Sequence, residues 1–216
     1  MPRPPLVSLL ACISMLACTP RGTTSTATPC DTSKEHAAAA AALDAEIVTT
    51  AIQADRVLKM KVRVDAQGNI VKQSVYHDKA DALPKPVLEA AEARFPGATV
   101  LHYETELYAD RGRVYEVEVD DAGKHCELAA TPEGAEVYVE CEVDPTSLSA
   151  EIRAAIEKTA PGGTILEAET KRGPEIDEVT VEVQQAEGEL YLRMRPDGSI
   201  LQVLRRVPGF IEVPLP

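Results

Sequence analysis

The feature that most constrains this chain is an internal repeat, because Leu83–Val143 is followed by a second copy that begins at Leu148. Short segments recur at a spacing of about 65 residues. They align as Pro96-Gly97 with Pro161-Gly162, Glu104-Thr105 with Glu169-Thr170, and Tyr115–Val119 with Val179–Val183. A period this regular indicates a repeated structural unit. Each copy is predicted to form one helix followed by four short strands.

Each predicted helix carries an apolar stripe at helical spacing. The stripes are Leu83, Val87, Ala91 and Phe95 in the first copy, and Leu148, Ile152 and Ile156 in the second. Pro96-Gly97 ends the first helix, since glycine accepts the left-handed conformation common there. The stripes need an apolar sheet face to bury against.

The strands alternate in the way of an antiparallel sheet with one solvated face. Upstream, Ser33–Lys59 is alanine-rich with apolar helical spacing, and a hairpin is expected around Asp65–Gly68. The predicted fold class is therefore α+β, with two tandem helix-plus-four-stranded antiparallel sheet units preceded by an N-terminal helix and β-hairpin. The expected divisions are residues 37–143 for the N-terminal helix, hairpin and first unit, 144–207 for the second unit, and 208–216 for a tail.

The first 17 residues have the pattern of a signal peptide, with Arg3 ahead of a short apolar run. The run is too short to span a bilayer, which takes roughly 20 residues. Leu16-Ala17-Cys18 resembles the lipobox of bacterial lipoproteins, which implies acylation of Cys18. A plain secretory signal, and a second lipobox ending at Cys12, are the alternatives. Residues 18–36 are predicted to be a disordered tether, and Thr19 favours the outer membrane over inner-membrane retention.

Composition excludes several function classes. Lys and Arg total 22 against 35 Asp and Glu, a net charge of −13, whereas nucleic-acid binders are usually basic. The four histidines fall in different predicted elements, outside any hydrolase or zinc motif. We therefore predict a protein that is not an enzyme, with no cofactor and no metal site.

Cys126 and Cys141 flank the turn at Pro132–Gly134. A hairpin centred between Glu133 and Gly134 places the two cysteines opposite each other. The same register pairs Leu128 with Val139 and Ala130 with Val137. Opposed cysteines can be bridged in an exported protein, and two reduced buried thiols are the alternative.

Several segments together resemble the PepSY-like domain. They are Leu83-Pro84 with Val87 and Ala90 in the helix, Phe95–Ala98 with Val100 after it, Tyr115–Val119 in the sheet, and the turns Glu133-Gly134 and Asp197-Gly198. That family is exported, often lipid-anchored and similar in fold to a β-lactamase-inhibitory protein. The resemblance implies inhibition or regulation of an exocellular enzyme, and it supplies no catalytic residue.

The sheet face opposite the helices is the predicted partner-binding surface. Its expected members are Glu116, Glu118, Tyr138, Glu140 and Glu142. An exposed tyrosine among carboxylates suits a protein partner that presents a basic patch. The alternatives are a solvated face on a purely structural or scaffolding envelope lipoprotein, and an acidic face that binds a cation or small ligand.

Overall fold

The computed structural model describes residues 44, 49 and 59–209. The predicted signal peptide, Cys18 and the tether lie outside these residues, as do nearly all of the predicted N-terminal helix and residues 210–216 of the tail. Within the described part of the chain, no helix has the length and apolar character needed to cross a membrane.

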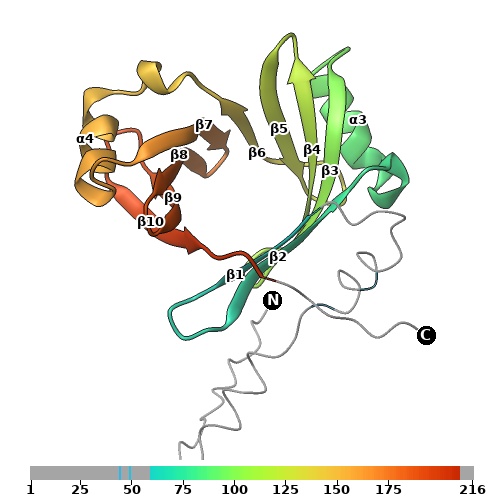
Figure 1. The fold of residues 1–216 in the computed structure, drawn as a ribbon. Coiled ribbons are helices and arrows are strands. Elements are labelled where there is room, and N and C mark those ends of the chain that lie inside the picture. The colour runs from blue at the N-terminus through green and yellow to red at the C-terminus, as the bar shows by residue number, and fades with distance from the viewer. Residues whose placement is uncertain (1–43, 45–48, 50–58, 210–216) are drawn as a thin grey trace, which may run out of the picture.

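One antiparallel sheet of ten strands, which follow one another in chain order, makes up most of the fold (Figure 1). The strands are β1 (Met60–Val64), β2 (Ile70–His77), β3 (Thr99–Tyr108), β4 (Gly112–Asp121), β5 (Lys124–Ala130), β6 (Glu136–Glu142), β7 (Thr164–Gly173), β8 (Ile176–Gln185), β9 (Gly188–Met194) and β10 (Ile200–Arg206). The hairpin predicted upstream of the repeats is β1–β2, and it forms one edge of the sheet.

The predicted fold class is wrong, because the structure does not divide into two helix-plus-four-strand units. The last strand of the first repeat pairs directly with the first strand of the second, from Val139 opposite Arg172 to Glu142 opposite Glu169. The ladder therefore runs without a break from β1 to β10. The unpaired edge of one repeat is satisfied by the other, which removes an exposed strand edge from each.

The sheet curls into a half-barrel, with its two ends turned toward each other (Figure 1). The Arg63 guanidinium on β1 lies 5.6 Å from the centre of the Tyr191 ring on β9. Five of the strand pairings contain a register shift, the first between Arg63 and Val64. Such bulges bend a strand and increase its twist, so they give the sheet its curvature.

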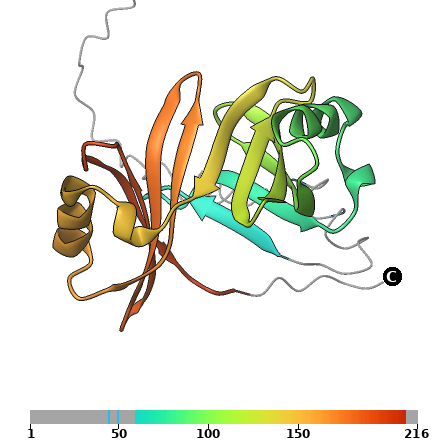
Figure 2. The ribbon, with the colours of Figure 1, turned by 90° about the horizontal axis from the view of Figure 1, so that it is seen from above.

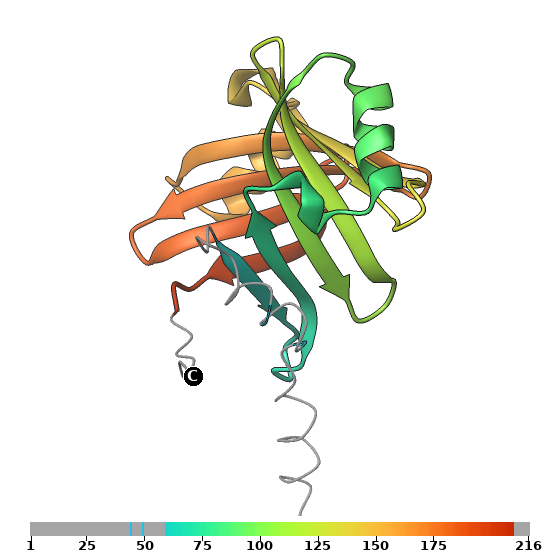
Figure 3. The same cartoon turned by 90° about the vertical axis from the view of Figure 1, so that its right-hand side faces the viewer.

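Two ten-residue helices, α3 (Lys85–Arg94) and α4 (Ala150–Thr159), lie on the outside of the curl, on opposite flanks (Figure 2). Each is preceded by a short 3-10 turn, η1 (Ala80–Ala82) or η2 (Pro145–Ser147). Helix α3 crosses the outer face of β4 and β5 (Figure 3). The Ser149 hydroxyl accepts from the Ile152 backbone N–H and so caps α4.

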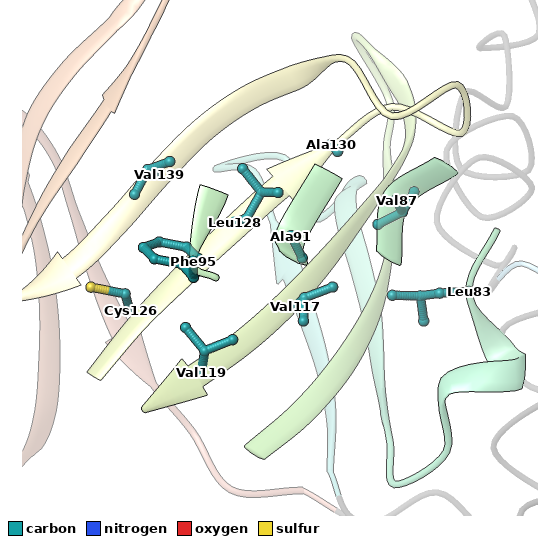
Figure 4. Packing of buried hydrophobic residues seen from close by; sticks show 10 residues of the cluster. All are labelled: Leu83, Val87, Ala91, Phe95, Val117, Val119, Cys126, Leu128, Ala130 and Val139. Carbon is teal, nitrogen blue, oxygen red and sulfur yellow. The ribbon is translucent and has the colours of Figure 1, made fainter. Parts of the chain in front are cut away.

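The apolar stripes of both helices are buried, as predicted. In the first repeat, Val87 is 0% exposed and packs with Val117 and Leu128 of the sheet (Figure 4). The second repeat has an equivalent core around Ile152 and Val181. The outer face of the sheet is therefore its hydrophobic face, and the concave face is the polar one.

The hairpin turn in each repeat packs against the start of that repeat's helix. Gly134 has a φ of 83°, and a Cβ on it would lie 2.5 Å from the Pro86 carbonyl oxygen. Gly198 has a φ of 82° and would place a Cβ 2.8 Å from the Glu151 carbonyl oxygen. Only glycine accepts both the left-handed backbone and the close approach.

The register predicted for the cysteine hairpin is confirmed at two of its three pairs. Cys126 lies opposite Cys141 with Cα atoms 4.1 Å apart, and the two are joined by a disulfide. Leu128 lies opposite Val139. The third pair is wrong, because a register shift after Ala129 places Ala130 opposite Glu136 instead of Val137.

Candidate functional site

The five residues predicted to bind a partner all lie on the concave face, but they are not a solvated surface. Glu116, Tyr138 and Glu140 are 5%, 1% and 3% exposed. Glu118 is half-buried and Glu142 is exposed at the end of β6. The expectation of an open face is wrong, because the curl turns this face toward itself.

Tyr138 is held between carboxylates. Its hydroxyl donates to Glu116 Oε1 and lies 3.4 Å from Glu106 Oε2. Burial, together with the nearby Glu116 charge, raises the pKa of the Tyr138 hydroxyl, so it remains a donor at neutral pH. The Lys171 ammonium lies 3.9 Å from the centre of its ring. Tyr138 therefore links the Glu106 and Glu116 carboxylates and the Lys171 ammonium in one buried network.

Glu140 accepts hydrogen bonds at the centre of a second cluster of polar side chains. Lys171 Nζ lies 2.5 Å from its Oε2 atom, and the Thr180 hydroxyl donates to its Oε1 atom at 2.7 Å. Burial alone would raise the pKa of Glu140, but the Lys171 charge and these hydrogen bonds hold that pKa below its usual value. Burial and the neighbouring Glu140 charge raise the pKa of Glu169 to about 9. Glu140 is thus ionised and Glu169 protonated at neutral pH.

This pair predicts how stability depends on pH. The folded-state pKa of Glu169 is about 9 against an ordinary 4.5, so its contribution to stability is present below pH 4.5 and is lost as pH rises through 9. Glu140 behaves oppositely, since its lowered pKa gives stability that is lost under acid. The ordinary pKa of 4.5 and the folded-state pKa of about 9 define the pH window for Glu169. Between pH 5 and pH 9, we expect the free energy of unfolding to fall less in Glu169→Gln than in the wild type. Urea unfolding across that range measures it.

Glu175→Gln is the matched control for this prediction. Glu175 is exposed in the β7–β8 turn, and its substitution removes the same charge. Its pH profile should follow that of the wild type. A Glu169→Gln profile as steep as the control would show that Glu169 is ionised in the folded protein.

A basic, aromatic cavity opens on the concave face. Its volume is about 60 Å³. It is lined by five cations (Arg63, Lys72, Arg111, Lys171 and Arg193), three tyrosines (Tyr108, Tyr138 and Tyr191), Glu178 and Ile176. Because these residues come from strands at both ends of the sheet, the cavity exists only when the sheet is curled.

Tyrosine rings and carboxylates hold the cations in place. Lys72 and Arg111 lie 5.0 and 4.7 Å from the centre of the Tyr108 ring. Arg193 makes a two-point contact with Glu178, at 2.8 and 2.7 Å. Burial lowers the pKa of Lys72 to about 8. The cavity is therefore a preorganised cationic site in an acidic chain.

Beside this cavity, β3 and β4 bring three buried glutamates together. The carboxylates of Glu104, Glu106 and Glu116 each have an oxygen within 4.8 Å of the others. Among the described residues, these three carboxylates have the ligand atoms and the spacing to hold a metal ion. The sequence analysis predicted no metal site and named a cation-binding acidic face only as an alternative.

Sequence reasoning missed the cations of this face and several of its glutamates, among them Glu104, Glu106, Glu169 and Glu178. The signal that could have found them is the period of two, because Glu104, Glu106 and Tyr108 alternate along β3 with residues that face outward. Lys72, Lys171 and Arg193 have the same inward parity on their strands. Which cation lies beside which glutamate depends on the pairing of strands that are far apart in the chain, and the period of two does not predict that pairing.

Part of the chain matches the model of a known protein family. Residues 86–147 match the model described as the peptidase propeptide and YPEB domain, PepSY. No curated protein matches the sequence. The matched segment runs from α3 to the end of η2, and it includes Glu104, Glu106, Glu116, Tyr138 and Glu140.

Several solved structures from Bacteroides species are similar over part of the chain. A BLIP-like protein of Bacteroides fragilis is 15% identical, covers 61% of this chain and 92% of its own, and has a TM-score of 0.46. A DUF2874 family protein of Bacteroides uniformis is 17% identical, with coverages of 56% and 88% and a TM-score of 0.47. A Bacteroides eggerthii protein described as periplasmic is 16% identical, with coverages of 57% and 88% and a TM-score of 0.48.

The PepSY match includes the resembling segments at Phe95–Ala98, Tyr115–Val119 and Glu133-Gly134, whereas Leu83-Pro84 and Asp197-Gly198 lie outside it. The resemblance is thereby confirmed over the first repeat. Residues 86–147 are thus similar to the PepSY domain.

Proposed function

We propose that the protein is a non-enzymatic binding protein of the cell envelope, which takes an acidic group of a protein partner into the concave-face cavity. The observation that carries this proposal is the gathering of five cations around one cavity in a chain of net charge −13. An acidic ligand approaches such a chain against its overall charge, so the binding free energy must come from the local site.

Arg63 is the cation best placed to contact a ligand. Lys72, Lys171, Arg193 and Arg111 each pair with a carboxylate. Among residues 59–209, by contrast, no carboxylate lies within ion-pair distance of Arg63, whose guanidinium instead stacks on Tyr191. A guanidinium held on an aromatic ring keeps its hydrogen-bond donors in a fixed plane that matches a carboxylate.

The partner is proposed to be an exocellular enzyme that the protein inhibits or regulates. The PepSY description names peptidase propeptides, which are segments of enzyme precursors, and this supports a role in binding an enzyme. The earlier expectation of a basic partner on Glu116, Tyr138 and Glu140 has lost its structural basis, because these side chains are buried. Exposed carboxylates such as that of Glu142 remain for a basic contact.

The proposed location is the outer membrane, with the domain anchored through acylated Cys18 and held away from the bilayer by residues 18–36. Both features belong to the part of the sequence outside the described residues. The signal-peptide pattern and the Leu16-Ala17-Cys18 motif support this proposal.

The test is binding of a fluorescent glutamate-rich peptide to the purified full chain. We expect Arg63→Gln to weaken this binding by about tenfold or more, because a hydrogen bond to a charged group contributes about 1.5–3 kcal/mol. Binding should also weaken as salt rises, since the contacts are electrostatic.

Arg195→Gln is the matched control, because Arg195 is exposed in the turn before β10 and its substitution removes the same charge. It should leave the affinity unchanged. Equal affinities of the Arg63→Gln variant and the wild type would contradict the proposed site. Absence of binding by the wild type would favour the alternative of a structural or scaffolding envelope lipoprotein.

A further inference from the structure

The concave face contains a cluster of buried carboxylates that the proposed function does not use. Glu104 and Glu116 lie directly opposite each other in the β3–β4 ladder, and Glu106 is two residues along β3 on the same face. Their exposures are 4%, 5% and 0%. Like charges directly opposite each other destabilise a sheet, so something must offset the charge of this group.

Unpartnered polar atoms lie at neighbouring positions on the same face of the sheet. Among the described residues, three buried side-chain atoms lack both a hydrogen-bond partner and an ion-pair partner: Ser74 Oγ, His102 Nδ1 and Glu104 Oε1. Ser74 lies opposite Glu106 in the β2–β3 ladder, and His102 is two residues from Glu104 on the same face. Native proteins leave few buried polar atoms unpaired, and a bound ion or water is the usual reason.

The neighbouring lysines offset only part of the charge. Lys72 contacts Glu106 Oε1, whereas Glu104 Oε1 and Ser74 Oγ have no hydrogen-bond partner. Lys61 lies on the same face, opposite Ser74 in the β1–β2 ladder. When all three glutamates are ionised, two lysines against three carboxylates leave a charge of −1 on a buried group. The Tyr138 hydroxyl, which donates to Glu116, adds no charge.

We propose that Glu104, Glu106 and Glu116, with Ser74, form a binding site for a divalent cation, for which Ca²⁺ is the best fit. Every donor is an oxygen, which suits a hard cation, and the three carboxylates can each supply one or two ligands. Mg²⁺ requires near-ideal octahedral geometry, which side chains on three paired strands do not readily adopt. Lys72 can remain near the Tyr108 ring, 5.0 Å away, when the ion takes its place at Glu106.

The cavity described above borders this site. Lys72 and Tyr138 line the cavity, and both also contact the carboxylate cluster. The cation site and the acidic-ligand site therefore share a wall but use different donors. Arg63→Gln should leave cation binding intact, which separates the failure of one proposal from the failure of the other.

The test is calorimetric titration of the purified full chain, stripped of metal, with Ca²⁺ and separately with Mg²⁺. We expect one Ca²⁺ per chain, and a loss of affinity of at least about tenfold in Glu104→Gln, because affinity follows the charge of the ligand set. Glu142→Gln is the matched control on the same face, since Glu142 is exposed and its substitution removes the same charge. It should bind Ca²⁺ like the wild type.

A second readout uses Tb³⁺, a luminescent substitute for Ca²⁺. The chain has six Tyr and no Trp, so Tb³⁺ emission excited through aromatic rings must come from a tyrosine such as Tyr138. Emission should appear in the wild type, fall on addition of Ca²⁺ and be absent in Glu104→Gln. Ser74→Ala, which changes no charge, should weaken binding while keeping the circular dichroism of the folded protein.

The inference is overturned if the wild type binds no divalent cation at about 1 mM, the weak end for extracellular calcium modules. It is equally overturned if Glu104→Gln and Ser74→Ala both bind Ca²⁺ as the wild type does.

Discussion

Lys171→Met is expected to lower the free energy of unfolding by ~3–5 kcal/mol, because it leaves the buried Glu140 carboxylate without its cation. The Lys171 and Glu140 side chains are only 13% and 4% exposed, so water does not replace the lost contact. The substitution also removes the ammonium from the face of the Tyr138 ring. Urea unfolding at pH 7 measures the change.

Arg172→Met is the control, one residue along the same strand. Arg172 pairs with Asp177 on the surface, where the two side chains are 77% and 67% exposed. Substitution of an exposed pair changes stability by about 0.5 kcal/mol or less. Adding Glu140→Gln to Lys171→Met should recover much of the loss, since the unpaired charge is then gone. Equal stabilities of Lys171→Met and Arg172→Met would show that Glu140 is solvated.

Removal of the Cys126–Cys141 disulfide is expected to lower the free energy of unfolding by ~3 kcal/mol, as the chain-entropy model gives for a loop of this length. The two cysteines are 15 residues apart, and Cys126 is 2% exposed in the first core. The measurement is urea unfolding of a variant with both cysteines replaced by alanine.

Reductant provides the control for the disulfide. It should lower the stability of the wild type toward that of the double-alanine variant, and it should not change the variant further. Non-reducing peptide mapping of the exported protein should recover the linked pair. Two alkylatable thiols in the native protein, with no effect of reductant on unfolding, would contradict the bridge. The equivalent positions of the second repeat are Leu190 and Arg205, which lie opposite each other. The second repeat is therefore stable without a disulfide at this place.

Local pattern predicted much of the outer face of this protein. The buried helix residues Val87, Phe95 and Ile152, and the pairing of Cys126 with Cys141, follow from periodicity and hairpin register. The pair of Ala130 with Val137 was wrong because a bulge after Ala129 shifts the register, and a bulge has no distinct signature in a short strand.

The curl of the sheet could not be predicted in the same way. Alternation divides a strand into two faces, and Glu116 and Tyr138 were placed correctly on the polar one. Whether that face meets water depends on how the strands join over the whole chain. The β6–β7 pairing and the approach of Arg63 to Tyr191 both link distant segments. Buried glutamates and lysines therefore resembled a solvated surface, and the fold class was misjudged for the same reason.

The central claim is that the polar face of this sheet is an enclosed interior and not an open docking surface. The most direct measurement is carbodiimide modification of carboxyl groups in the native full chain, followed by peptide mass mapping. The structure predicts rapid modification of the exposed Glu136 and Glu142, and protection of Glu116 and Glu140, which are 5% and 3% exposed, until the protein unfolds. Modification of Glu116 and Glu140 as fast as Glu142 would mean that the face is solvated, and would contradict the claim.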